Sequence, residues 1–106
     1  MIVVTTNDLP GYRIVKVLGL VRGITVRSRN AFGTIGGSLQ SLLGGNLSLF
    51  TTLAETSRKA ALDLMIEHAD QHGANAVIAM RYDSNDIAAG ITEMLAYGTA
   101  VVAEPL

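Results

Sequence analysis

The sequence predicts an α+β domain of two layers, in which an antiparallel sheet is covered by one long helix. Two observations lead to this class. Segments rich in β-branched residues lie near both ends of the chain, at 12–28 and 91–103. Between them, residues 52–73 follow the period of a helix with one apolar face. A chain of 106 residues without a break in composition is expected to form a single domain, 1–106.

The N-terminal part of the chain is predicted to form two strands. MIVVTT, at residues 1–6, has the β-branched density of a short strand, and NDLPG then ends it with turn residues. The segment YRIVKVLGLVRGITVRS follows at residues 12–28 as one long strand. Its two glycines, Gly19 and Gly23, predict a bulge or a bend.

The glycine-rich segment 33–46 has two interpretations. Leu39, Leu42 and Leu43 are spaced for a short helix that ends at Gly44, and a mobile connector is the alternative. The glycine pairs lack the following Gly-Lys-Ser/Thr of a phosphate-binding loop, so phosphate binding is not expected there.

The long helix has predicted signals at both of its ends. Thr52 and Glu55 have the spacing of a capping box, and Gly73 supplies the left-handed residue that ends a helix. One face is polar, with Lys59, Asp63, Glu67 and Asp70. The predicted apolar face, which we expect to lie against the sheet, contains Leu53, Ala54, Ala60, Ala61, Leu64 and Met65.

The C-terminal third is predicted to be a hairpin. NAVIAMRYDS at residues 75–84 reads as a strand, SNDIAAG at 84–90 as a loop, and ITEMLAYGTAVVA at 91–103 as a second strand. A connection of turn length indicates an antiparallel pair.

The composition favours self-association. Hydrophobic residues make up 49% of the chain and charged residues only 16%, against about 25% charged in ordinary soluble domains. A membrane span does not explain this excess, because Lys16 and Arg22 interrupt the best apolar segment, IVKVLGLVRGITV. We therefore expect a homo-oligomer whose interface resembles a domain core cut in half.

Charge and cysteine content exclude several classes of function. The formal net charge is −1, with 8 basic and 9 acidic residues, so nucleic acid is not expected as a partner. The absence of cysteine excludes disulfides, thiolate metal sites and cysteine nucleophiles. The N-terminal segment MIVVTTNDLPG lacks a secretory signal pattern, so we expect a cytoplasmic protein.

The sequence HADQH places His68 and His72 on one face of the predicted helix. Zinc takes four ligands, or three and a water, so these residues supply half of a site for a divalent metal such as zinc. Ala69 stands where a His-Glu-x-x-His motif requires glutamate. The missing ligands would come from a neighbouring subunit or from the hairpin, namely Asp83, Asp86 or Glu93. The alternative is that both histidines only end a helix, where cations favour its dipole.

Four other polar residues are candidates for a polar site or an interface. Arg81 and Asp83 have the same parity in their strand, and Glu93 lies on the next one, so a cross-strand ion pair is one interpretation. A solvated sheet edge is the other. Arg58 interrupts the apolar side of the helix and is interpreted as an anchor between subunits or between helix and strand.

No arrangement of residues predicts catalysis. The sequence contains no Gly-x-Ser-x-Gly motif, and both histidines lie at one helix end. We expect a binding or scaffold protein and no enzyme. The alternatives are a weak binder of divalent metal, and a carrier of a small ligand with its pocket between subunits.

Several segments together resemble the YbjQ-like family, also named UPF0145, which carries a heavy-metal-binding label. The resemblance covers nearly the whole chain, and it rests on GANAVIAMRYD at 73–83, AYGTAVV at 96–102, GLVRG at 19–23, Thr5-Thr6, Asn30, Gly44-Gly45 and Arg58. It implies a dodecin-like α+β subunit that assembles into a pentameric ring. The chain departs from the family pattern at Ile24, Asn46 and Phe50-Thr51, where relatives carry polar or charged residues.

Overall fold

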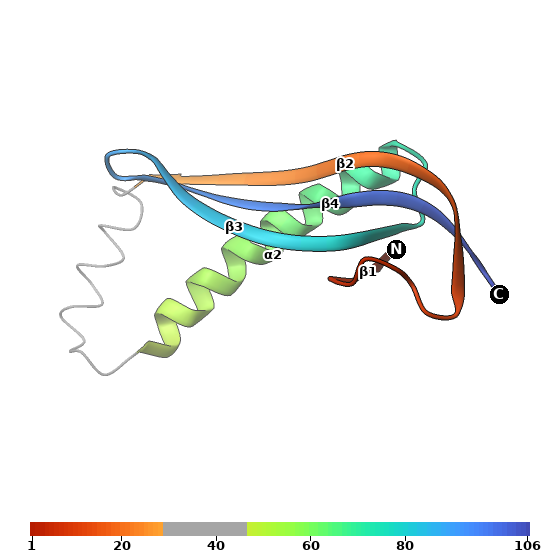
Figure 1. Cartoon of the computed structure of the whole chain (residues 1–106). Coiled ribbons are helices and arrows are strands. Elements are labelled where there is room, and N and C mark those ends of the chain that lie inside the picture. Colours follow the sequence, from red (N-terminus) through yellow and green to blue (C-terminus); the bar gives the residue numbers. More distant parts are fainter. Residues whose placement is uncertain (29–46) are drawn as a thin grey trace.

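The computed structural model describes residues 1–28 and 47–106 of the chain. In this part a four-stranded sheet carries one long helix on one face, which confirms the predicted α+β class (Figure 1). The prediction for residues 33–46 lies outside the described residues. The elements are β1 (Ile2–Val3), β2 (Tyr12–Ser28), α2 (Leu47–Gln71), β3 (Ala76–Ala88) and β4 (Ile91–Pro105).

The sheet is mixed, with the strand order β1-β3-β4-β2. β4 pairs antiparallel with both of its neighbours, as predicted. β1 instead pairs parallel to β3, with Ile2 opposite Ala76. The prediction of a wholly antiparallel sheet is therefore wrong at β1. The reason is that β1 pairs with a strand far along the chain, and a long connection permits either direction.

The two glycines of β2 have different roles. Gly19 has a φ of +112° and lies at a shift in the β2–β4 register, so the predicted bulge is confirmed there. Gly23 lies in regular register instead. A Cβ atom at Gly23 would overlap the backbone of Ala61 and Met65, so a glycine is required there for the helix to approach the strand.

The helix begins earlier than predicted. It starts at Leu47, so Thr52 lies inside it and the predicted capping box is wrong. Its C-terminus agrees with the sequence: Gly73 has a φ of +82°, and its N–H donates to the carbonyl oxygen of Asp70 at 2.9 Å. The N–H of Ala74 donates to the carbonyl oxygen of Ala69 at 3.1 Å, which completes a Schellman motif.

The face of α2 that meets the sheet is built from small residues and one methionine. Ala61 and Met65 are fully buried, which confirms that part of the predicted apolar face. They belong to one cluster with Val21 and Ala96 of the two strands beneath. Leu64, by contrast, is 43% exposed, because this side of the helix lies at the outer edge of β2 and not over the sheet.

The predicted loop at 84–90 is largely strand. β3 continues to Ala88, which pairs with Ile91, so the connection is a turn of residues 89–90. Gly90 has a φ of +75°, as such a tight turn requires. Near this end of the hairpin, the Thr92 hydroxyl donates to Oδ1 of Asp86 at 2.9 Å. The polar residues of 84–88 therefore lie in a ladder that is exposed to water.

The opposite face of the sheet is covered at one end only. There, Leu9 of the N-terminal segment packs on Ala76, Ile78 and Val101. The N–H groups of Ala79 and Met80 hold this segment in place by donating to carbonyl oxygens of residues 6 and 4, at 2.7 and 3.0 Å. The remaining length of this face has no covering layer among the described residues.

Candidate functional site

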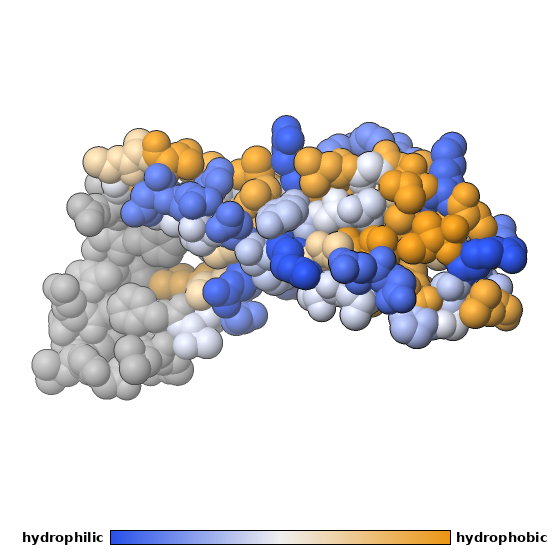
Figure 2. Space-filling model, viewed as in Figure 1, coloured by the Kyte–Doolittle hydropathy of each residue, from blue (hydrophilic) through white to orange (hydrophobic). Residues whose placement is uncertain are grey.

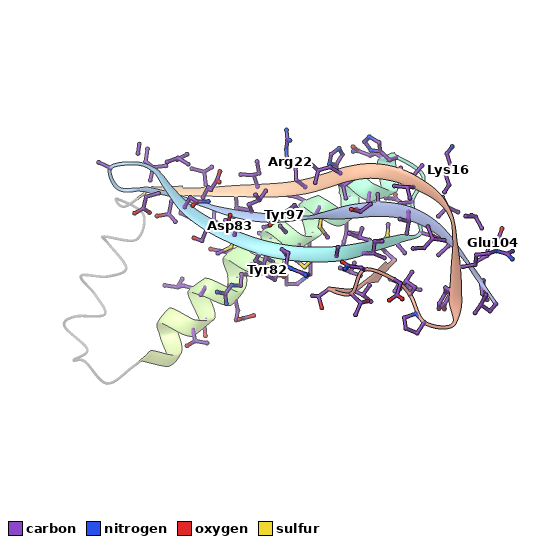
Figure 3. The ribbon with its side chains drawn as sticks, viewed as in Figure 1. Lys16, Arg22, Tyr82, Asp83, Tyr97 and Glu104 are labelled. Atoms are coloured by element: carbon purple, nitrogen blue, oxygen red, sulfur yellow. The ribbon has the colours of Figure 1, made fainter. Side chains whose placement is uncertain are left out.

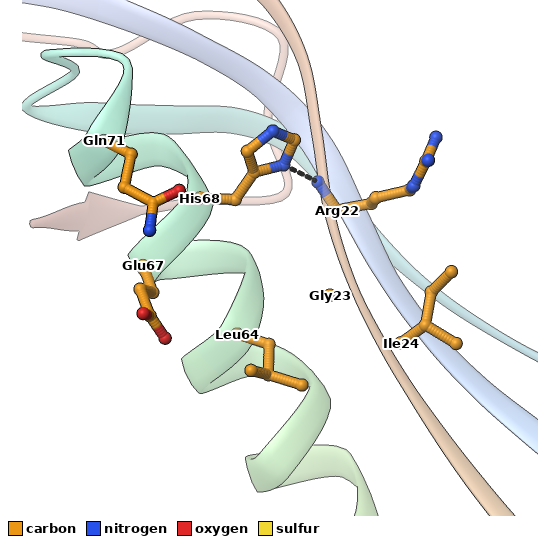
Figure 4. A pocket seen from close by; sticks show the side chains of 7 residues that line it. All are labelled: Arg22, Gly23, Ile24, Leu64, Glu67, His68 and Gln71. Atoms are coloured by element: carbon orange, nitrogen blue, oxygen red, sulfur yellow. Dashed lines mark hydrogen bonds between the residues drawn. The ribbon is translucent and has the colours of Figure 1, made fainter.

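A groove of about 340 Å³ lies between α2 and the edge strand β2. Leu64 gives it an apolar wall on the helix, polar side chains of α2 lie beside Leu64, and Ile24 borders the groove on the strand (Figure 4). Gly23 permits the two backbones to come this close at its floor. The lining residues are Arg22, Gly23, Ile24, Leu64, Glu67, His68 and Gln71.

His68 connects the helix to the strand at this groove. Its Nδ1 lies 3.1 Å from the backbone nitrogen of Arg22, as the dashed line in Figure 4 shows. A backbone N–H can only donate, so Nδ1 is the acceptor and the hydrogen of the neutral ring lies on Nε2. The side chain of this half-buried histidine therefore acts as a bridge from α2 to the backbone of β2.

His72 makes a different contact. Its Nδ1 lies 2.9 Å from the carbonyl oxygen of His68, and a carbonyl can only accept, so Nδ1 carries the hydrogen. The two rings meet edge to face with their centroids 4.7 Å apart. His72 is exposed, and in its neutral form the lone pair of Nε2 is free.

The predicted zinc site is not complete in the part of one chain that the structure describes. No group of three or more His, Asp or Glu side chains within metal-binding reach occurs among the described residues. The hydrogen bond to Arg22 also leaves His68 without a free ring lone pair. The hairpin residues Asp83, Asp86 and Glu93 do not join the histidines in such a group. Of the predicted pair, only His72 offers a ligand atom.

The proposed polar group of the hairpin is spread along the strands. Arg81 lies opposite Tyr97, Asp83 opposite Leu95, and Glu93 opposite Asn85. The Arg81 guanidinium donates at 2.8 Å to the carbonyl oxygens of residues 5 and 80, so it fixes the N-terminal segment instead of pairing with a carboxylate. The predicted cross-strand ion pair is therefore not formed.

Arg58 has a local role in this subunit. It is exposed, and its guanidinium lies 3.5 Å from the carboxylate of Glu55, one turn earlier in the helix. The prediction that it anchors the helix to a strand is wrong, because its side chain leaves the helix on the solvent side. A contact with another subunit stays a prediction.

The regular part of β2 exposes a row of large apolar side chains. Leu20 is 64% exposed, Ile24 41% and Val26 50%, whereas Val21 between them is 1% exposed. Side chains alternate across a strand, so the exposed row lies on the face opposite α2. Figure 2 shows hydrophobic side chains recurring along the upper border of the molecule, where β2 runs.

Sequence reasoning did not find this row or the groove. The alternation of β2 was visible, but both parities of residues 14–26 are rich in apolar residues. Gly23 was the sequence signal for the parity that meets the helix, because a residue without a side chain lets another backbone approach.

None of the helices among the described residues is long and apolar enough to cross a membrane.

Comparison with protein families gives one match that spans almost the entire chain. The family model YbjQ_1, described as "Putative heavy-metal-binding", matches residues 1–104. A UPF0145 protein of Solibacter usitatus is 56% identical over 103 residues, covering 97% of this chain and 92% of the relative. A UPF0145 protein of Burkholderia thailandensis is 56% identical over 102 residues, covering 96% and 92%.

A solved structure has a similar fold. It is a crystal structure of a protein with unknown function of the DUF74 family from Pediococcus pentosaceus. The TM-score is 0.64, the sequence identity 14%, and the alignment covers 98% of each chain. At this identity the likeness concerns the fold alone.

Proposed function

Because the chain belongs to the YbjQ family, whose description is "Putative heavy-metal-binding", we propose that it is a self-assembling binding or scaffold protein and not an enzyme. The subunits form a closed ring, and the pentamer implied by the sequence resemblance is the expected state. The protein acts in the cytoplasm, and its principal partner is a further copy of itself.

The observation that carries this proposal is the uncovered apolar row of Leu20, Ile24 and Val26. These side chains lie on a regular strand at the edge of the sheet, where pairing with another chain is easiest. Burial of apolar surface contributes roughly 25 cal/mol per Å², so covering such a row favours association. Monomeric proteins seldom leave a row of this kind exposed unless a partner covers it.

A non-catalytic role is supported by what the polar side chains do. His68 accepts a backbone hydrogen bond, Arg81 donates to two carbonyl oxygens, and Arg58 pairs with its neighbour on the helix. Each of these contacts stabilises the fold. A catalytic group instead needs a partner that activates it beside a site for a substrate.

The proposal is tested by the mass of the purified protein in solution. Light scattering and native mass spectrometry at micromolar concentration should give a multiple of the 11.2 kDa chain, with five copies expected. The monomer mass would overturn the proposal. Ile24→Lys should lower the mass toward the monomer, whereas Leu106→Lys, at an exposed residue of the C-terminus, should leave it unchanged.

A second candidate function, metal binding, is favoured by the geometry of His72. A histidine that binds a metal usually donates its other ring N–H to a carbonyl or a carboxylate, and His72 donates to the carbonyl oxygen of His68. The further ligands would have to come from other copies in the assembly. Such a site exists only in the oligomer.

Metal uptake distinguishes the two histidines. If His72 is a ligand, His72→Ala should abolish the uptake of zinc or nickel measured by calorimetry and elemental analysis, whereas His68→Ala should retain it. If the wild-type oligomer takes up no metal, the metal function is excluded and self-assembly is unaffected.

A third candidate is a carrier that holds a small ligand between subunits. The groove between α2 and β2 supports it, since the apolar side chain of Leu64 lies beside polar groups at Glu67 and Gln71. Native mass spectrometry of protein purified without denaturation should then show an added mass on each subunit. Subunits of bare chain mass would exclude this candidate.

A further inference from the structure

β2 is an edge strand of the sheet, and among the described residues no strand pairs with its outer side. The Arg22 N–H donates to His68, so residue 22 directs its backbone groups away from β4. In an antiparallel pair these directions alternate, so Leu20, Ile24 and Val26 also direct their N–H and C=O groups outward. The register with β4 is unbroken from Leu20 to Ser28. Among these outward residues, only Arg22 has its N–H bonded within the described chain.

β3 has the second free edge of the sheet. β1 pairs with Ala76 and Val77, and among the described residues no strand lies beside β3 from Arg81 onward on that side. The same alternation, continued through β4, directs the backbone groups of Ser84 outward. Among the described residues, the Ser84 N–H donates only to Oδ1 of the neighbouring Asp83, at 2.9 Å.

The two edges have opposite charge. The charged residues of β2 are all basic: Arg13, Lys16, Arg22 and Arg27. On β3 the exposed half contains Asp83 and Asp86 beside Arg81, and Arg81 already bonds the N-terminal segment. Pairing β2 with a second β2 would place like charges together, whereas pairing β2 with β3 places opposite charges together.

Arg22 and Asp83 fit one another in particular. Arg22 lies opposite Tyr97, which lies opposite Arg81, so these three side chains are on the same face of the sheet. Asp83 lies two residues beyond Arg81 on β3 and therefore has the same orientation. The side chains of Arg22 and Asp83 are thus both on the face away from α2. Figure 3 shows Arg22 extending from β2 and Asp83 on β3, across the sheet from it. Neither has an ion-pair partner among the described residues.

We propose that the free edge of β2 in one copy pairs with the free edge of β3 in the next copy, with Arg22 beside Asp83 of the partner subunit. This inference rests on the proposed self-assembly and names its interface. The contact joins two different surfaces, so repetition by rotation generates a ring. β2 and β3 both run antiparallel to β4, so they point in the same direction within one subunit. In a ring whose axis lies along the strands, β2 of one copy and β3 of the next copy therefore pair in parallel.

Charge reversal tests the proposed contact. Arg22→Glu and Asp83→Arg should each raise the concentration at which the oligomer dissociates by at least tenfold, measured by light scattering. The double variant Arg22→Glu with Asp83→Arg should recover assembly, because every interface of the ring then joins a glutamate to an arginine, whatever the number of subunits. Lys59→Glu, on the exposed side of the helix, is the control and should assemble as the wild type does. Circular dichroism confirms that each variant is folded.

The outcomes separate the two proposals. A monomeric wild type would overturn the proposed self-assembly. An oligomeric wild type whose mass responds to neither charge reversal would overturn only the β2–β3 interface. Recovery when Arg22→Glu is mixed with wild type, but not in the double variant with Asp83→Arg, would indicate that two β2 edges meet and would also overturn it.

A disulfide test is available because the chain contains no cysteine. In the double variant Ile24→Cys with Asn85→Cys, the two thiols of one chain are separated by β4, about 10 Å apart, which is too far for a disulfide. Oxidation should therefore link different chains into a ladder of covalent oligomers. Covalent dimers from Ile24→Cys alone, or no linkage in the double variant, would contradict the proposed pairing.

Discussion

Adjacent residues of β2 lie in opposite environments on the two faces of the sheet. Val21 is 1% exposed against α2, and Leu20 beside it is 64% exposed on the other face. The face toward α2 is lined by small residues, such as Gly23 and Ala96, on which the helix backbone packs directly. The other face presents large side chains, such as Ile24 and Val26, to water.

This difference separates the requirements of folding from those of assembly. On the covered face, the short distance between helix and strand limits the volume that each residue can occupy. On the open face, the monomer places no such limit, so the size and apolar character of those side chains need another reason. Substitutions on the covered face should therefore change the free energy of unfolding, and those on the open face should change association.

The largest expected effect is that of Gly23→Ala. The new Cβ would overlap backbone atoms of Ala61 and Met65, which cannot move unless the helix leaves the sheet. We expect a loss of more than about 3 kcal/mol in the free energy of unfolding, measured by urea denaturation. An unchanged midpoint would show that α2 does not pack on β2 in this way.

Next in size is the loss of a buried side chain. Met65→Ala should cost about 2–5 kcal/mol, because Met65 is fully buried between α2 and the sheet and its removal leaves a cavity. Met94→Ala, at a partly buried residue that packs on the same cluster, is the control and should cost less. The same urea experiment measures both variants, and equal losses would contradict the assigned core.

A smaller effect is expected where the helix bonds the strand edge. His68→Ala removes the acceptor for the Arg22 N–H and should cost about 1 kcal/mol in the free energy of unfolding. In the monomeric background of Asp83→Arg, amide hydrogen exchange at Arg22 should become faster, since this N–H then has lost its acceptor. His72→Ala is the matched control, and faster exchange at Arg22 in that variant as well would contradict a specific bond.

The smallest effect on folding, and the largest difference between the faces, is expected for Leu20→Ala. Leu20 is exposed in the monomer. When Leu20→Ala is added to the monomeric variant Arg22→Glu, the free energy of unfolding should therefore change by at most about 0.5 kcal/mol. Without that background, Leu20→Ala should weaken assembly, measured by light scattering. Val21→Ala should behave in the opposite way, with a loss of about 2 kcal/mol in unfolding.

Local sequence signals predicted much of the fold. β-branched density located β2 and β4, and Gly73 predicted the end of α2, because a left-handed residue with a Schellman motif is a local requirement. Predictions failed where a competing local signal was stronger. The capping pair at Thr52 resembled a helix start, and the polar residues of 84–88 resembled a loop although a tight turn at Gly90 continues the ladder.

The candidate site was less predictable, because its contacts join distant parts of the chain. The partner of His68 is a backbone N–H 46 residues away, and no local pattern of His68 and His72 indicates that bond. The spacing of the two histidines was equally compatible with a metal site and with a helix end. The hydrogen bonds in the structure showed that His68 has no free ring lone pair, whereas Nε2 of His72 has one.

The sequence by itself determined the kinds of elements, the end of the helix, and an excess of apolar residues over what one small core can cover. Periodicity fixes which side chains share a face, since this depends only on backbone geometry. The tertiary structure alone decided which face of β2 the helix covers, that β1 runs parallel to β3, and that two edges of opposite charge pair with no further strand among the described residues. These choices depend on packing between residues far apart in the chain, where the close approach at Gly23 decides the side on which α2 lies.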